Sequence, residues 1–105
     1  MPTSEATARF FSEYERLRPD QQEQFKAALR EFVSVLRAME RVSFRGIPRF
    51  PAHLGVKPMV NHRSIMEFAW APDGRATWEY GPPIRSGMYH IRCRRIGTHA
   101  IYDDP

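Results

Sequence analysis

The chain has 105 residues, of which 42% are hydrophobic, and its 16 lysines and arginines outnumber its 12 aspartates and glutamates. This length suits one domain with one core, the apolar content excludes a disordered chain, and no apolar run approaches the ~20 residues of a membrane-spanning helix. With one cysteine and no signal-peptide pattern, we expect a single cytoplasmic domain over residues 1–105 that has no disulfide framework and no membrane partner.

Two amphipathic helices are predicted within residues 1–41. The first, over residues 4–18, repeats apolar side chains at helical spacing, and Pro19 ends it because proline disfavours a helical conformation in the residue before it. Asp20 can cap a second helix, which has a long apolar face and continues to about residue 41. We expect the two helices to form a hairpin that packs its apolar faces on a partner.

After residue 42 the spacing of apolar residues changes from a helical period to the alternation typical of strands. The segment from Ser43 to Pro51 is rich in proline and is predicted to be an irregular connection. The predicted strands cover residues 54–60, 64–71, 75–80 and 88–96, and a closing segment covers residues 99–102. Pro58 makes the first strand an edge strand or a bulged one. Pro72-Asp73-Gly74 joins the second and third strands in a hairpin, with the glycine available for a positive φ.

These elements predict an α+β fold in which the helical hairpin packs on a four-stranded, mainly antiparallel sheet over residues 54–102. Alternation assigns apolar side chains to the covered face of the sheet and polar side chains to the other face. The residues expected in the core are Met66, Phe68, Trp70 and Trp78. Cys93 alternates with Ile91 and is predicted to be a small buried apolar residue, not a nucleophile.

Positive charge is concentrated in the second part of the chain. Residues 1–41 carry seven basic and seven acidic side chains, whereas residues 42–105 carry nine basic and five acidic ones and all four histidines. A basic face suits RNA, because arginine and lysine neutralise phosphates. The same pattern also fits an ordinary solvated face of an antiparallel sheet. The residues expected to contact RNA are His90, Arg92, Arg94 and Arg95, together with His62 and Arg63.

The second part of the chain also carries the candidates for catalysis. Glu67 and Glu79 can face each other across the hairpin, but two carboxylates are too few for a metal site, so neither a metal nor another cofactor is expected. RNA cleavage without a metal uses the ribose 2′-hydroxyl as the nucleophile. It needs a base, an acid for the leaving 5′-oxygen and cations for the charged transition state. The candidates for these roles are Lys57, Arg75, His99 and Tyr102.

Three segments resemble the RelE/ParE toxin family. The run from Glu67 to Tyr80 (EFAWAPDGRATWEY) is similar to the central hairpin of that family, in which an arginine opens the second strand just after the turn. The run from Arg95 to Tyr102 (RIGTHAIY) is similar to its closing strand, where a glycine precedes a histidine or basic residue and an Ile-Tyr or Val-Tyr ending. The run from Leu54 to Lys57 (LGVK) resembles its first strand after the helices, which presents a lysine. With the helices, the resemblance spans about residues 9–102.

The resemblance implies a ribosome-dependent endonuclease that cleaves mRNA, halts translation and is neutralised by a cognate antitoxin. It implies that Arg75 stabilises the phosphate in the transition state and that Lys57 contacts phosphate. It also implies that His99 and Tyr102 carry acid–base chemistry or orient the substrate. His99 stands where many ribonuclease members carry arginine or lysine, so its role within that set is open.

Two features depart from the family pattern. Many members begin with a β-strand that pairs into the sheet, whereas the prediction here is a helix over residues 4–18, and Asp103-Asp104-Pro105 leaves no room for a C-terminal helix. The family also contains inhibitors of DNA gyrase that lack the ribonuclease residues. Two alternatives therefore stay open: a ParE-like gyrase inhibitor that is not an enzyme, and an RNA- or protein-binding module that kept the fold without the chemistry.

Overall fold

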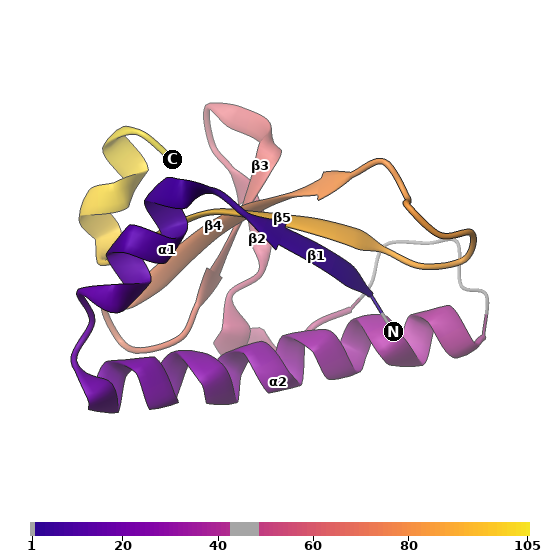
Figure 1. The fold of residues 1–105 in the computed structure, drawn as a ribbon, viewed down its shortest axis with the longest axis horizontal. Helices are drawn as coiled ribbons and strands as arrows, with labels where there is room; N and C mark the ends of the chain where they lie inside the picture. The colour runs from indigo at the N-terminus through magenta and orange to yellow at the C-terminus, as the bar shows by residue number, and fades with distance from the viewer. Residues whose placement is uncertain (1, 43–48) are drawn as a thin grey trace.

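The computed structural model describes residues 2–42 and 49–105, so most of the predicted connection, residues 43–48, lies outside the described residues. Figure 1 shows the elements, which in chain order are β1 (Thr3–Ala6), α1 (Ala8–Glu15), α2 (Pro19–Arg41), the 3-10 helix η1 (Ala52–Leu54), β2 (Lys57–Met59), β3 (His62–Ala69), β4 (Arg75–Gly81), β5 (His90–Gly97) and the 3-10 helix η2 (His99–Asp103). In the part of the chain that is described, no helix combines the length and the apolar character needed to cross a membrane.

The strands form one sheet in the order β1-β5-β4-β3-β2. β1 runs parallel to β5, and every other pair of neighbours is antiparallel. The long helix α2 runs along one face of the sheet, and the C-terminal segment, drawn in yellow, lies on the opposite side (Figure 1). The predicted α+β fold with a mainly antiparallel sheet is therefore confirmed, with five strands instead of four.

The helix predicted over residues 4–18 is wrong in its first part, where the chain forms β1. The Thr7 hydroxyl accepts a hydrogen bond from the backbone N–H of Phe10 at 3.0 Å, and this cap starts α1. Before the cap, the N–H of Thr3 donates to the carbonyl of Tyr89 at 2.9 Å, so the chain pairs with β5. These hydrogen-bond partners lie on the edge of β5, far along the chain. The spacing of apolar residues within residues 4–18 therefore does not reveal them. The initial strand that many RelE/ParE members have is thus present.

α2 begins at Pro19, so the predicted cap at Asp20 is wrong. The backbone N–H of Arg18 donates to the side-chain oxygen of Gln21 at 2.9 Å, and a proline in the first turn has no N–H that needs a partner. Asp20 instead pairs with the Arg18 guanidinium at 3.1 Å. It also lies in the first turn, where the helix dipole favours a negative charge.

Aromatic rings join α2 to the sheet. Phe32 of α2 is 2% exposed; its ring stacks on Phe68 with 5.3 Å between centroids and meets Trp78 edge-on at 4.8 Å. Such stacked and edge-to-face pairs add to the free energy gained from burial alone. Trp70 is also buried, and Met66 packs half-buried against the same cluster. The four residues predicted for the core are therefore confirmed.

The strand predicted over residues 54–60 is shorter and begins later. Leu54 belongs to η1, and Gly55 has a φ of 57°, in the left-handed region that favours glycine. β2 forms only afterwards, at the edge of the sheet, and its register with β3 shifts between Pro58 and Met59. The predicted irregular edge strand at Pro58 is confirmed.

β5 contains a bulge that the alternation of its sequence does not predict. Thr77 pairs with Arg95 and Trp78 pairs with Cys93, which leaves Arg94 as an extra residue without a partner position on β4. Before the bulge, the odd-numbered residues Ile91 and Cys93 face the core. After the bulge, the even-numbered Ile96 faces it. Arg94 and Arg95 are therefore adjacent residues that both lie outside the core.

The segment predicted to close the sheet over residues 99–102 is not a strand, because β5 ends at Gly97 and η2 follows. The hydroxyl of Thr98 accepts a hydrogen bond from the backbone N–H of Ala100 at 3.2 Å and starts this turn. A Cβ at Gly97 would lie 2.9 Å from a methyl carbon of Ile101, so the glycine lets η2 fold back closely on the strand.

Gly74 of the β3–β4 hairpin is required for a reason other than the predicted one. Among the described glycines, those with positive φ are Gly55 and Gly87, so Gly74 is not there for a left-handed conformation. A Cβ at Gly74 would lie 2.6 Å from ring carbons of Trp70. The glycine makes room for the indole, which is 8% exposed and donates from Nε1 to the carbonyl of Arg75 at 3.0 Å.

We predict that Gly74→Ala lowers the free energy of unfolding by about 1–3 kcal/mol, because the added methyl group overpacks the turn against Trp70. In a Trp70→Leu background the obstacle is gone, and the same substitution should cost little. Urea denaturation of the four proteins of this double-mutant cycle gives the coupling. An equal cost in both backgrounds would contradict the packing explanation.

Candidate active site

The face of the sheet opposite α2 carries a row of polar side chains. Lys57, Glu67, Thr77 and Arg95 are successive cross-strand partners on β2, β3, β4 and β5. Side chains of cross-strand partners point to the same face of a sheet. The C-terminal segment lies against this row, since the Thr77 hydroxyl donates to the carbonyl of Pro105 at 3.0 Å.

Two arginines of β5 hold the backbone of the C-terminal segment. Nε of Arg94 donates to the carbonyl of Pro105 at 3.1 Å, and Nη1 of Arg95 donates to the carbonyl of Asp104 at 3.0 Å. Arg95 is itself fixed by Glu13 of α1, with Nη2 and Oε2 2.6 Å apart and both side chains largely buried. These contacts hold η2 over the sheet.

Side chains of η2 then meet side chains of β2, β3 and the β3–β4 turn. The Tyr102 hydroxyl donates to Oε1 of Glu67 at 2.8 Å, and Nζ of Lys57 lies 3.9 Å from the same oxygen. The Tyr102 ring meets the ring of His99 edge-on, with 5.5 Å between centroids. Nδ1 of His99 bonds to a carboxylate oxygen of Asp73. These contacts form one continuous chain from β2 to the hairpin turn.

Burial raises the pKa of Tyr102 above the ordinary range of a phenol, the hydrogen bond to Glu67 raises it further, and the nearby Arg75 guanidinium opposes both effects. An ionised Tyr102 would place a second negative charge against the Glu67 carboxylate. The phenol therefore keeps its proton and is suited to directed hydrogen bonding, not to acting as a free phenolate.

A hydrogen bond from His99 lowers the pKa of Asp73. The Asp73 carboxylate is then ionised and can only accept, so Nδ1 of His99 carries a proton toward it. The backbone N–H of His99 also points to the same Asp73 oxygen, at 3.5 Å. Because Asp73 occupies Nδ1, Nε2 is the ring nitrogen available to a substrate.

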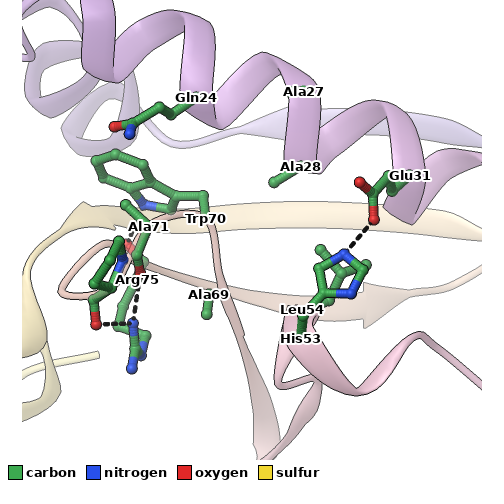
Figure 2. Close-up of a pocket in the computed structure, with 11 residues that line it drawn as sticks. Gln24, Ala27, Ala28, Glu31, His53, Leu54, Ala69, Trp70, Ala71 and Arg75 are labelled. Carbon is green, nitrogen blue, oxygen red and sulfur yellow. Dashed lines mark hydrogen bonds and ion pairs between the residues drawn. The ribbon is translucent and has the colours of Figure 1, made fainter.

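Arg75 opens β4, and its guanidinium is folded onto the hairpin turn. Nη1 donates to the carbonyl of Gly74 at 2.8 Å. It also donates to the carbonyl of Ala71 at 3.1 Å, and Figure 2 shows this second bond. An arginine has five N–H donors, so this anchoring leaves others for a phosphate. We use the name polar cluster for the following residues: Lys57, Glu67, Asp73, Arg75, His99 and Tyr102.

The polar cluster contains all four residues predicted for catalysis and two that were not predicted for it. Their catalytic roles stay predictions, whereas their proximity is a property of the fold. The place of Glu67 could have been predicted from the sequence, because a carboxylate at a polar position of one strand and a lysine on the neighbouring strand indicate a cross-strand ion pair. The part that Asp73 plays could not be predicted from its place in a turn, because its contact with His99 depends on how η2 folds back.

The predicted pairing of Glu67 with Glu79 across the hairpin is wrong. Glu67 is opposite Thr77, and Glu79 is opposite Arg92. Within the described residues, no three histidine, cysteine, aspartate or glutamate side chains gather as metal ligands would. Cys93 is half-buried against the core, and burial raises the pKa of its thiol to about 11, which disfavours the thiolate at neutral pH.

The basic residues predicted on β5 do not form an open cationic face. His90 is 4% exposed; its Nδ1 lies 2.8 Å from the Thr3 hydroxyl, and its Nε2 lies 3.4 Å from a carboxylate oxygen of Glu5. Glu5 also pairs with Nε of Arg92 at 2.9 Å. The pairing of β1 with β5, which the sequence did not predict, thus covers His90 and neutralises Arg92.

The next two arginines of β5 are also paired, Arg94 with Glu79 at 3.3 Å and Arg95 with Glu13. The expectation that β5 presents a row of free cations is therefore corrected. His62 and Arg63, in contrast, are exposed at the start of β3.

A hollow of about 520 Å³ lies on the other side of the hairpin, between α2 and β3 (Figure 2). His53 of η1 and Glu31 of α2 face each other in it, with Nε2 and Oε2 2.5 Å apart. Trp70 and Arg75 form its wall near the turn. Arg75 therefore stands at the border between this hollow and the polar cluster.

No protein-family model and no curated protein sequence matches the chain. Solved structures do match it. YafQ from E. coli strain BL21(DE3) is 16% identical with a TM-score of 0.56, over 95% of this chain and 96% of that one. A chain of the E. coli DinJ–YafQ complex is 14% identical with a TM-score of 0.60, over the same shares. A YoeB/ParE toxin from Agrobacterium tumefaciens is 11% identical with a TM-score of 0.52, over 92% of this chain and 98% of that one.

At these identities the similarity bears on the fold alone. The match extends over nearly the whole length of both chains in each case. The resemblance read from the three sequence segments is confirmed at that level: the chain has the fold of the RelE-like toxins of the RelE/ParE family.

Proposed function

We propose that the chain is the toxin of a type II toxin–antitoxin system and that it cleaves mRNA on the ribosome, in the cytoplasm, without a metal. The observation that carries this proposal is the polar cluster, in which Lys57 of β2, Arg75 of β4, and His99 and Tyr102 of η2 lie together. The shared fold with YafQ and the YoeB/ParE toxin supports the toxin role.

The chemistry of the polar cluster fits cleavage by the ribose 2′-hydroxyl. Attack on the adjacent phosphorus builds negative charge on the phosphate oxygens, which Arg75 and Lys57 would offset. The leaving 5′-oxygen needs a proton, and His99, held by Asp73, has a ring nitrogen free for that exchange. Tyr102 contributes a fixed phenol beside it. These groups together supply acid–base chemistry and charge stabilisation from one side of the sheet.

Fewer residues are free to bind the RNA on either side of the cleaved bond than the sequence predicts. We propose that His62 and Arg63, which are exposed, bind phosphates next to Lys57. Arg92 and Arg94 keep 39% and 36% of their side chains exposed despite their ion pairs, so they too can reach the backbone of an RNA. His90 and Arg95 are left out of this surface, because the first is buried and the second is held by Glu13.

We also propose that a cognate antitoxin neutralises the protein. The DinJ–YafQ structure is a toxin–antitoxin complex of a protein with the same fold. A net charge of +4 favours an acidic partner segment. A helix or extended segment that covers the polar cluster, or that packs on the helices, would block access of RNA.

We predict that the parent protein cleaves mRNA in a reconstituted translation system and that Arg75→Ala and His99→Ala each reduce the rate about 10²–10⁴-fold. This is the range for loss of a transition-state cation or of an acid–base group. Rates are read from the 5′ ends of the products by primer extension. Arg85→Ala and His53→Ala are matched controls outside the polar cluster and should cleave like the parent.

Intact mRNA in the presence of parent protein would contradict the ribonuclease proposal. Growth arrest on expression would then favour a ParE-like inhibitor of DNA gyrase, which supercoiling by purified gyrase would test. Equal losses in the control variants and in the polar-cluster variants would contradict the assignment of the site, although not the activity.

The raised pKa of Tyr102 predicts its behaviour at high pH. The folded protein holds the phenol proton more tightly than the unfolded chain does, so the protonated phenol adds to the free energy of unfolding. This contribution is fully present below about pH 10, the ordinary pKa of a tyrosine. It is lost as the pH rises through the pKa of Tyr102 in the folded protein. The difference in absorbance at the phenolate band between parent and Tyr102→Phe should therefore develop only above the range of an ordinary tyrosine. A difference that develops near pH 10 would show that Tyr102 is solvated and not bound to Glu67.

A further inference from the structure

We propose that Glu67 is the terminal proton acceptor of the cleavage step and receives the proton of the ribose 2′-hydroxyl through Tyr102. This inference rests on the proposed ribonuclease function. It identifies the base of the reaction, which the residues predicted for catalysis left unassigned.

Glu67 is a buried carboxylate at the centre of the polar cluster. It is 7% exposed and lies in the middle of β3, between Lys57 on β2 and Thr77 on β4. Its Oε1 accepts the Tyr102 hydroxyl at 2.8 Å and lies 3.9 Å from Nζ of Lys57. A buried charge is costly unless it is paired and hydrogen-bonded. One phenol and one ammonium meet that need here, and both belong to residues predicted for catalysis.

The direction of the Tyr102 hydrogen bond decides what the phenol can do for a substrate. A phenol has a single proton, and that proton points to Glu67. The Tyr102 oxygen therefore meets an incoming hydroxyl group as an acceptor. A ribose 2′-hydroxyl can donate to it, whereas the buried Glu67 itself is shielded from direct contact.

Transfer in two linked steps avoids a free phenolate, which the burial of Tyr102 disfavours. As the bond from the 2′-oxygen to phosphorus forms, the 2′-hydroxyl proton passes to the Tyr102 oxygen and the phenol proton passes to Oε1 of Glu67. The bond from phosphorus to the 5′-oxygen breaks, and that oxygen takes a proton from His99. The products are a 2′,3′-cyclic phosphate and a 5′-hydroxyl.

The proton count closes over one turnover. Glu67 gains one proton through Tyr102, and His99 loses one to the leaving group. Glu67 then returns its proton through Tyr102 to water, and His99 regains one from water. Lys57, next to Glu67, and Arg75, at the turn, balance the charge while the phosphate carries its extra negative charge.

Substitution by glutamine separates a proton acceptor from a residue that only positions Tyr102. Glu67→Gln keeps the size of the side chain and an oxygen that accepts a hydrogen bond, but a carboxamide does not take up the proton. We expect kcat to fall about 10²–10⁴-fold with KM unchanged, because only the transition state loses an interaction. Glu23→Gln changes an exposed glutamate of α2 that pairs with Lys26, away from the polar cluster and from β5, and should leave cleavage unchanged.

Three further variants complete the test. Tyr102→Phe breaks the same relay, so Glu67→Gln combined with Tyr102→Phe should cleave no more slowly than either single variant. Glu67→Asp keeps a proton acceptor, so it should retain more activity than Glu67→Gln even if both lower the melting temperature equally.

Cleavage by Glu67→Gln at the parent rate would overturn the relay and leave the ribonuclease proposal standing. Greater activity in Glu67→Gln than in Glu67→Asp would overturn it as well, because position would then matter more than proton uptake. Absence of cleavage by the parent would overturn the relay together with the proposed function.

Discussion

The candidate site depends on the contact between two adjacent arginines of β5 and the backbone of the C-terminal segment. Arg94 and Arg95 donate to carbonyl groups beyond η2, and hydrogen bonds from a charged donor are the stronger kind. Both can do so because the bulge in β5 places two consecutive residues outside the core. With regular alternation, one of the two guanidinium groups would face the aromatic core. The bulge therefore lets η2 carry His99 and Tyr102 over β3.

Ion pairs between the N-terminal part of the chain and β5 decide where positive charge remains on the surface. The N-terminal part is neutral as a whole, but its glutamates reach across to the basic strand, Glu5 from β1 and Glu13 from α1. The surplus of positive charge is cancelled where these elements meet β5. It persists at the exposed start of β3, where Arg63 lies, whereas the two basic side chains of the polar cluster, Lys57 and Arg75, are matched by the carboxylates of Glu67 and Asp73. Charge counted along the sequence thus identifies a basic protein without locating its basic surface.

Elements with a strong local signal were predicted well from the sequence. The β3–β4 hairpin follows from alternation around a turn, α2 from a long helical period, and the covered face of the sheet from Phe68, Trp70 and Trp78. β1 was missed because a four-residue strand owes its hydrogen bonds to β5, far along the chain. η2 was missed because it depends on the close approach of Ile101 to Gly97. Neither contact can be inferred from the spacing of apolar residues within one segment.

By itself, the sequence determined the α+β class and the residue types able to handle a phosphodiester, among them Arg75 after the turn and His99 and Tyr102 near the end. Only the tertiary structure decided which side chains meet: Tyr102 with Glu67, His99 with Asp73, and His90 with Thr3 of β1. The physical reason is that periodicity follows from the backbone geometry of one segment. Contacts between segments depend on register, on a bulge and on the angle at which the chain folds back, and these follow from the packing of the whole molecule.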